Sequence, residues 1–490
     1  MRLLKESFLL AVLLVSLTLA QTGTRLVGFD AKTMGRGGAS IGTFDSNVLM
    51  MTNPAGISFL NHSTLDVNFS MMAPTLHFKN KLNDMEGDKN LFPLPNASYI
   101  NKSESNLTWG IGFFTAGGMG ADFKMKHALY GTTLQDYHSQ LASMQGGISV
   151  AYKFSENFSV GVSAHLVYSM LEFSMPYSLD PMMMKGVAIP GMTFGMMFAA
   201  PSSMGGFGYD EVTAVAKMTD LTALGFNGKI GIAYKVSDRL SLGLSYTLPT
   251  SLTYTKGKAS MDMTAQLNDA FGKAVQGAMM QNPGMTQAQA QAAVMAQFAG
   301  LGINMATGVQ ANYDLDVDLK SPQSFGFGIA YTASDDLKLS ADVEYLNWKN
   351  AYDKMALKLS NGTSSNVNKI MGSTAFNIDF PMNWKNSILV KIGGEYTASK
   401  DLTLRLGYAF GSNPVPEETI FPVFPAVVEN HITAGASYKV STPITLHAAF
   451  EMALNNSLNA SMTSLIANEY DGSTSDLSTI LIHIGFSYAF

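Results

Sequence analysis

The chain has 490 residues, of which 47% are apolar and only 14% charged, and its formal net charge is −6. This charged fraction lies well below the roughly 25% of an average soluble domain, and the mild negative charge argues against the dense basic surface that nucleic-acid binding requires. Cysteine is absent, which excludes disulfides, thiolate catalysis and a cysteine-linked lipid anchor.

The first twenty residues have the layout of a secretory signal peptide. Arg2 and Lys5 precede an apolar stretch at 8–19, and small side chains stand before a cut after Ala20. The alternative is a transmembrane anchor, which requires about 20 apolar residues. This stretch is shorter, and no run of 18 apolar residues follows it. The sequence therefore predicts an exported chain without membrane-spanning helices, from which residues 1–20 are removed.

Residues 21–62 show no alternating pattern. They include GFDAKTMGRGGASIGTFDSNVLMMTNPAGISFL at 28–60, in which glycine and other small residues separate apolar side chains. We expect this segment to fold compactly inside the structure that the following strands enclose. Within it, Asn53, Pro54, Ala55 and Gly56 predict at least a turn, because proline fixes φ and asparagine often precedes turns.

A turn motif recurs through the rest of the chain. Each copy reads Tyr, two residues, Ser, two turn-forming residues and an apolar residue, as in YTASDDL and YTASKDL. The copies begin at Tyr152, Tyr234, Tyr331, Tyr396 and Tyr438, with a longer version at Tyr99. Serine, aspartate and asparagine form turns readily, and the flanking residues alternate in polarity. Each copy therefore predicts a β-hairpin.

The two faces of these strands differ in a way that favours lipid as the outer solvent. In LTLRLGYAF at 402–410, one face is Leu, Tyr and Phe, whereas the other holds Thr403, Arg405, Gly407 and Ala409. An apolar exterior and a small or polar interior are typical of a transmembrane β-barrel. Such a barrel must close, because lipid offers no partner to a free strand edge. The alternative is a soluble multi-sheet β protein.

Fourteen alternating segments predict a 14-stranded antiparallel outer-membrane β-barrel over residues 63–490. The segments are 64–73, 94–102, 106–116, 142–153, 158–172, 226–235, 240–256, 321–332, 336–349, 386–397, 401–410, 431–439, 443–454 and 480–490. Six connections are short and seven are long, which is the outer-membrane pattern with short turns in the periplasm. An even strand number places both termini in the periplasm, and the chain ends on an aromatic residue, Phe490, as outer-membrane barrels do.

The third strand, NLTWGIGFFTAGGMGADF at 106–123, predicts a local irregularity. Gly117, Gly118 and Gly120 follow Phe113 and Phe114. Glycine within a strand marks a bulge or a bend. The alternative is an ordinary strand end that passes into a loop.

Two long loops, 173–225 and 256–320, are rich in apolar residues. The first includes PMMMKGVAIPGMTFGMMFAAPSSMGGFG, and the second is rich in Ala, Gln and Met around an Asn-Pro-Gly break. The second predicts two helices, at about 262–281 and 286–299. Methionine suits surfaces that accept varied apolar shapes, so we expect a groove for a hydrophobic ligand. The alternative is that the loops cover each other.

Two stretches resemble the FadL/TodX family of outer-membrane transporters for long-chain fatty acids and other hydrophobic compounds. MGRGGASIGTFDSNVLMMTNPAGISFL at 34–60 is similar to the family's N-terminal hatch, and residues 384–440 resemble its barrel. The resemblance implies that 21–62 is a hatch plugging the lumen. It also implies that substrate collects among the loops, reaches a pocket against the hatch and leaves sideways at a kink in the third strand, without an energy source.

A fatty acid carboxylate requires a cation or hydrogen-bond donors inside the lumen. Arg36 in the hatch, Arg405 on the eleventh strand and Lys338 on the ninth are the candidates. Each could instead be a structural partner of Asp342, of Glu344 or of hatch carbonyls.

Motifs of enzymes and of cofactor sites are missing. No HExxH, GxSxG or GxxxxGK[ST] pattern occurs. We therefore expect no catalysis, no metal, no cofactor and no nucleic-acid partner. The predicted function is passive transport of hydrophobic molecules, with long-chain fatty acids first, by a monomer in outer-membrane lipid. The alternatives are a channel for aromatic or alkane hydrocarbons, a non-transporting surface receptor or adhesin, and a general porin.

Overall fold

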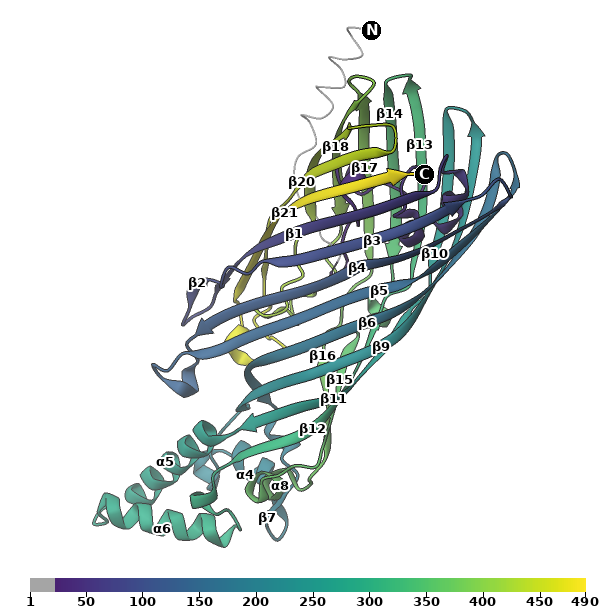
Figure 1. Cartoon of the computed structure of the whole chain (residues 1–490). Helices are drawn as coiled ribbons and strands as arrows, with labels where there is room; N and C mark the ends of the chain where they lie inside the picture. Colours follow the sequence, from purple (N-terminus) through teal and green to yellow (C-terminus); the bar gives the residue numbers. More distant parts are fainter. Residues whose placement is uncertain (1–22) are drawn as a thin grey trace.

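The computed structural model describes residues 23–490, which form a barrel with long loops at one end (Figure 1). Its wall contains fourteen antiparallel strands, so the predicted strand number is confirmed. They are β1 (Thr64–Lys79), β3 (Phe92–Lys102), β4 (Leu107–Met125), β5 (Gln135–Ser155), β6 (Phe158–Leu179), β9 (Val212–Ser237), β10 (Leu240–Thr247), β13 (Ser324–Ser334), β14 (Leu337–Leu346), β17 (Ser387–Thr397), β18 (Leu402–Gly411), β19 (Asn430–Lys439), β20 (Ile444–Asn459) and β21 (Thr474–Ala489).

The first and last strands close the barrel. β1 pairs with β21 along its whole length, from Thr64 opposite Ala489 to Lys79 opposite Thr474. Each other wall strand pairs with the wall strands before and after it. Closure satisfies the backbone groups that lipid would otherwise leave unpaired.

Four consecutive wall strands are interrupted and continue toward the loops as separate segments. The continuations are β11 (Thr250–Asp262) after β10, β12 (Gln310–Ser321) before β13, β15 (Lys354–Ser360) after β14 and β16 (Phe376–Pro381) before β17. Pro249 and Pro322 stand at two of the breaks, where each removes a donor from the ladder. Helix α7 (Trp348–Ala351) occupies a third. Each of the four strands is thus divided into a wall segment and a segment nearer the loops.

The outside of the barrel is an apolar belt. Leu166, Leu224 and Leu406 point outward and are 67%, 73% and 71% exposed. Such exposure of large apolar side chains is typical of a surface that contacts lipid. The short turns, with their tyrosines, lie at one edge of the belt, which we call the turn end. The opposite edge, which carries the long connections, is the loop end.

Several strands run further toward the loop end than the apolar alternation predicted. β9 begins at Val212 rather than 226. Beyond the belt the outward side chains are charged and pair with each other, as Lys258 does with Asp314 at 2.6 Å. Because these faces contact water, apolar alternation stops while strand pairing continues. The two predicted loops, 173–225 and 256–320, are correspondingly shorter, at 180–211 and 263–309.

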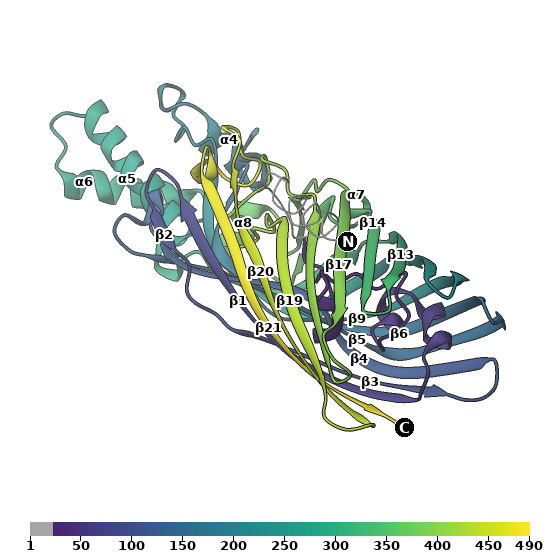
Figure 2. The same cartoon turned by 90° about the horizontal axis from the view of Figure 1, so that it is seen from above.

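A helical hairpin projects from the loop end (Figures 1 and 2). Its helices, α5 (Thr264–Gln281) and α6 (Gln287–Gly300), confirm the two predicted helices to within two residues. Thr286 and Gln289 form a capping box that begins α6. The other elements near this end are β2 (Asp84–Glu86), η2 (Ala128–Tyr130), η3 (Pro181–Met183), β7 (Val187–Ile189), β8 (Met192–Thr193), α4 (Phe194–Ala199), η4 (Ser202–Met204), η5 (Met305–Thr307), α8 (Ser365–Met371) and η6 (Asn468–Tyr470).

The N-terminal segment lies inside the barrel (Figure 2). This segment, the hatch (21–62, described from residue 23), contains α2 (Ala31–Met34), α3 (Leu49–Thr52) and η1 (Pro54–Phe59), and most of it is buried. Asp30 caps α2 by accepting a hydrogen bond from the Thr33 amide. The predicted signal peptide, 1–20, lies outside the described residues. No helix among residues 23–490 is long and apolar enough to cross a membrane.

Candidate functional site

The hatch motif predicted at Asn53–Gly56 lies against the inner wall. Asn53 donates through Nδ2 to the carbonyl of Ile41 (2.8 Å) and to that of Ile232 on β9 (3.0 Å). Pro54 begins η1, where a fixed φ suits the first helical position, and Ala55 and Gly56 continue it, fully buried. The motif is therefore both a turn and a link between hatch and wall.

Inward glycines allow the hatch to approach the wall closely. We call seven of them, one on each of seven strands, the glycine belt: Gly161, Gly231, Gly243, Gly328, Gly393, Gly407 and Gly435. A Cβ at any of these positions would lie within 2.7 Å of a hatch atom, and at Gly243 it would lie 1.9 Å from the Ile41 carbonyl oxygen. Backbone can meet backbone at this distance only where the side chain is hydrogen.

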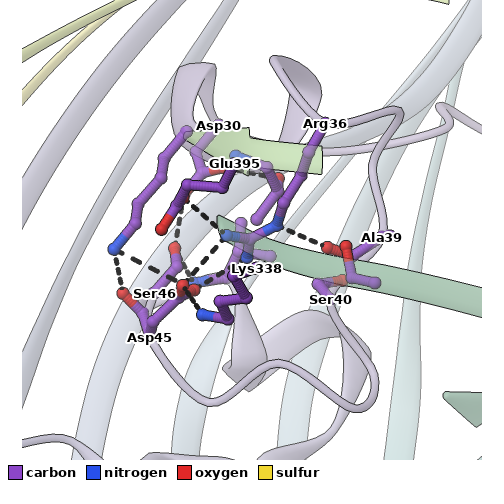
Figure 3. Close-up of polar contacts among 12 residues, drawn as sticks. Asp30, Arg36, Ala39, Ser40, Asp45, Ser46, Lys338 and Glu395 are labelled. Carbon is purple, nitrogen blue, oxygen red and sulfur yellow. Dashed lines mark hydrogen bonds and ion pairs between the residues drawn. The ribbon is translucent and has the colours of Figure 1, made fainter. Parts of the chain in front are cut away.

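A charged cluster joins the hatch to the wall (Figure 3). Arg36, which is 1% exposed, donates to both carboxylate oxygens of Asp45 at 2.7 and 2.9 Å. Lys338 on β14 reaches the same carboxylate at 2.7 Å. Arg405 on β18 donates to Glu395 at 2.6 Å, and Arg36 approaches this carboxylate at 3.4 Å. The three cations predicted as ligand contacts thus pair with carboxylates of the protein.

The acids named as alternative partners of these cations hold other groups. Asp342 accepts hydrogen bonds from the amides of Ser40 (2.6 Å) and Ile41 (2.9 Å). Glu344 pairs with Arg25 and Lys391, each at 2.7 Å. Alternation placed both acids correctly on the inner face. Alternation does not show how far apart two residues on one face lie along the strand. Since a strand rises about 3.3 Å per residue, Asp342 lies about 13 Å along β14 from Lys338. Of the alternative partners that the sequence offered for these cations, only a hatch carbonyl is found, because Arg36 donates through Nε to the carbonyl oxygen of Ala39.

The charged cluster controls the protonation of Asp45. Burial alone would raise the pKa of this carboxyl, but the charges of Arg36, Lys32 and Lys338 outweigh burial and hold the pKa well below its ordinary value. A group with a lowered folded-state pKa stabilises the fold above its unfolded pKa, near 4 for aspartate. The stabilisation is lost as pH falls through the folded pKa, so the ionic link should persist at neutral and mildly acid pH.

We expect Asp45→Asn to loosen the hatch while the barrel stays folded. The amide keeps the shape but leaves buried Arg36 without its main partner, and breaking a buried pair from one side costs about 3 kcal/mol or more. Hydrogen exchange at pH 7 should become faster in 23–60 and stay unchanged in the wall strands. Asp335→Asn, which alters a turn carboxylate that is 94% exposed, is the control. Equal hatch protection in the two variants would contradict the expectation.

β4 has the irregularity predicted for the third strand. Its register against β5 shifts between Thr115 and Gly117, which marks a bulge. The hatch enters this bulge, since Arg25 bridges to Gly117 and the Gly118 amide donates to Thr24 at 3.0 Å. Of the other predicted residues, Phe113 faces outward, Phe114 is buried, and Gly120 provides space for Phe92.

The wall is unpaired between β3 and β4 beyond this point. Their ladder ends where Asn96 lies opposite Phe114, and β4 continues paired only to β5. On β3, Pro93 and Pro95 lack amide protons and cannot donate to β4. We call this part of the wall, between 92–95 and 116–121, the lateral gap.

A cavity lies inside the barrel beside the β4 bulge. It is lined by Ala116–Gly118 of β4, by Arg25 of the hatch, by Lys229 of β9, and by Trp348 and Tyr352 at the interrupted strands. The centres of water molecules have about 80 Å³ available in it, which is room for several waters or a polar head group. The hatch, the β4 bulge and the strand breaks thus meet at one site.

Polar groups in the cavity wall are left without partners among residues 23–490. They include the Trp348 indole N–H and the Asn227 amide oxygen, in side chains that are 1% and 2% exposed. Lys229 is buried and donates to Thr247 Oγ1 at 3.0 Å, and no carboxylate among the described residues pairs with it. Buried polar groups usually have partners. The cavity therefore suits a polar ligand group that can pair with the Lys229 ammonium and accept a hydrogen bond from the Trp348 N–H.

Sequence reasoning missed Lys229 and the glycine belt, although both left a signal. Counting back from Tyr234, which faces outward, alternation places Lys229 on the inner face. Four belt glycines stand three residues before the tyrosine of a turn motif: Gly231, Gly328, Gly393 and Gly435. The G-x-x-Y spacing therefore marks the level at which the hatch meets the wall.

Solved structures with the same fold are known. The P. putida toluene transporter TodX has a TM-score of 0.67 and 18% identity, covering 95% of this chain and 99% of that chain. A Pseudomonas aeruginosa FadL homologue has a TM-score of 0.68 and 15% identity, covering 96% and 100%. The Ralstonia pickettii toluene transporter TbuX has a TM-score of 0.64 and 17% identity, covering 95% and 99%. At these identities the similarity establishes the fold alone.

A family profile covers almost the whole chain. The profile described as outer membrane protein transport protein (OMPP1/FadL/TodX) matches residues 12–490. Among curated protein sequences, no significant match was found. The family profile, the fourteen-stranded barrel and the enclosed hatch agree with one another, and this protein therefore belongs to the OMPP1/FadL/TodX family of outer-membrane transport proteins.

Proposed function

We propose that this protein carries long-chain fatty acids passively across the outer membrane. The molecule enters among the loops, binds in the cavity with its carboxylate at Lys229, and leaves sideways through the lateral gap. The observation that carries the proposal is the position of Lys229 on β9, a buried cation that no carboxylate of residues 23–490 pairs with, in the same cavity as the β4 bulge. A carboxylate is the anion that such a group binds well.

The cations first predicted for this role fit it less well. Arg36, Arg405 and Lys338 already hold Asp45 and Glu395, and a ligand carboxylate would have to break those ion pairs. Lys229 requires no such exchange. The Trp348 N–H lines the same cavity and supplies a second donor.

The orientation follows from the same proposal. The turn end faces the periplasm and the loop end faces the medium, as in outer-membrane barrels generally, and we expect both termini on the periplasmic side. The barrel acts as a monomer, since one chain contains the hatch, the cavity and the gap. No energy source is required for movement down a gradient.

Uptake of aromatic or other hydrocarbons is the second candidate function. Two of the similar structures are described as toluene transporters. Aromatic side chains also line the cavity, among them Tyr254, Trp348 and Tyr352. A hydrocarbon has no carboxylate, so it would leave Lys229 without a partner, and this observation favours the fatty acid.

Calorimetric titration of the detergent-purified protein separates these functions. We expect saturable binding of oleate and much weaker binding of oleyl alcohol and toluene. Equal binding of the alcohol, or preference for toluene, would replace the proposal with a hydrocarbon channel. If none of the three binds to a folded barrel, a surface receptor or adhesin becomes the better interpretation. Steady ion conductance by the unliganded protein in planar bilayers would indicate a general porin.

A further inference from the structure

The connection between β18 and β19 is folded into the barrel. We call residues 412–429 the strap. Most of its apolar side chains are buried: Val415, Ile420, Phe421, Val423, Phe424, Ala426, Val427 and Val428. Prolines at 414, 416, 422 and 425 prevent the strap from extending the neighbouring strands as a hairpin. It therefore fills part of the lumen, on the loop side of the cavity, as a coil.

The strap is attached firmly at its ends and sparsely in its middle. Near its start, the Lys385 amide donates to Pro414 (2.7 Å), and the amides of Ser461 and Leu465 donate to Glu417 and Glu418. From 420 to 428, no main-chain hydrogen bond joins it to the rest of the described chain. Two side chains hold this part: Ser139 of β5 donates to the Val423 carbonyl, and Asn456 of β20 donates to the Val427 carbonyl at 2.7 Å. The middle can move without breaking a strand ladder.

Two phenylalanines of the strap occupy an aromatic chamber. Phe421 contacts Phe380, Phe173 and Tyr470, with ring centroids 5.2, 6.1 and 6.5 Å away. These residues, with Tyr177 on Phe380, form the chamber. Since all of them are uncharged rings, the chamber is chemically suited to an apolar molecule.

Phe424 connects this chamber to the cavity. Its ring lies 6.2 Å from that of Phe421, nearly parallel at 9°, and 6.4 Å from Tyr352, which lines the cavity. Trp384 lies 6.1 Å from Phe424 and stacks on Tyr352 at 4.5 Å. An unbroken series of rings thus leads from the chamber to the cavity, and two of its members belong to the strap.

We propose that the aromatic chamber is a second binding site for the transported molecule, and that Phe421 and Phe424 occupy it until the molecule displaces them. The proposal rests on the proposed function, because it places this site on the path from loops to cavity. Ser139 lies on the far side of the barrel from β18 and β19, so the strap crosses the lumen. A molecule that approaches from the loop end must move it.

A reversible crosslink tests whether the strap moves. The chain has no cysteine, so the double variant Ser139→Cys/Val423→Cys introduces its only two thiols, and mass spectrometry verifies that they pair within one chain. We expect the oxidised protein to lose most uptake of labelled oleate by cells that produce it, and reduction to restore it. Ser103→Cys/Ser105→Cys, at a short turn where the two hydroxyls lie 2.6 Å apart, is the matched control. Normal uptake with the strap crosslinked would overturn the proposal.

Removing the two strap phenylalanines from the chamber tests the proposal independently, through ligand affinity. In Phe421→Ala/Phe424→Ala the ligand no longer competes with the strap's own rings, so toluene should bind to the purified protein about fivefold to tenfold more tightly. Unchanged or weaker toluene binding by a folded barrel would count against the proposal, and if this variant does not fold, the crosslink decides alone. A wild-type protein that neither binds nor takes up oleate or toluene would instead refute the proposed function.

Discussion

Replacing Gly393 with leucine is expected to open the barrel to ions. Gly393 faces the hatch on β17, and a Cβ there would lie 2.2 Å from the Arg36 carbonyl oxygen. The leucine cannot fit without displacing the hatch backbone, since overpacking costs about 1–3 kcal/mol even where neighbours can shift. A fourteen-stranded barrel without its plug approaches the size at which an aqueous channel forms. Conductance in planar bilayers should therefore rise by roughly tenfold or more above the wild-type baseline.

The next residue on this strand, Gly394, provides a closely matched control. Gly394 faces outward on the same strand, and a Cβ there would lie 3.7 Å from Leu339, an ordinary contact. Gly394→Leu makes the same chemical change in the same strand, so any general effect on folding should be similar. If both variants assemble and conduct equally, the glycine belt does not hold the hatch. Gly393→Ala should give an intermediate conductance, because its methyl alone meets the hatch carbonyl.

The barrel was predictable from sequence because alternation and turns are local signals. Alternation indicated which face of each strand contacts lipid, and the alternating segments were enough to count fourteen strands. The continuation of β9 back to Val212 was missed because its outward residues, such as exposed Lys217, are polar and suit water rather than lipid. Alternation between apolar and polar residues marks only those strands whose outer face contacts lipid.

The site was predicted less well because its contacts join distant parts of the chain. Arg36 and Arg405 were named for their charge and position, but their partners Asp45 and Glu395 become neighbours only when the hatch is enclosed. The strap was read as part of a barrel-like stretch, although its four prolines indicate a segment that cannot pair. Composition identified an apolar path, and only the fold shows which residues fill it.

Replacing Lys229 with methionine should separate carboxylate binding from apolar binding. Methionine has a similar length and no charge, so it removes the hydrogen bond to a carboxylate and keeps the packing. Hydrogen bonds to charged groups contribute about 1.5–3 kcal/mol, which predicts about a 10- to 150-fold weaker affinity for oleate. The affinities for oleyl alcohol and toluene should stay within roughly twofold of wild type. Calorimetric titration of the purified variant measures all three.

Lys235→Met tests whether oleate binding depends on the position of the charge at Lys229 or only on the number of positive charges in the lumen. Lys235 lies six residues along β9 on the same inner face, but it lies over the Phe59 ring of the hatch at 4.8 Å and does not line the cavity. Both variants remove one inward positive charge from one strand, so a general electrostatic effect of the lumen would weaken oleate binding in both. A loss confined to Lys229→Met would place the carboxylate in the cavity. Equal loss of toluene and oleate in Lys229→Met would mean that Lys229 only supports the cavity's shape. If oleate affinity is unchanged, the carboxylate binds elsewhere, and the unpaired cation has no part in choosing the ligand.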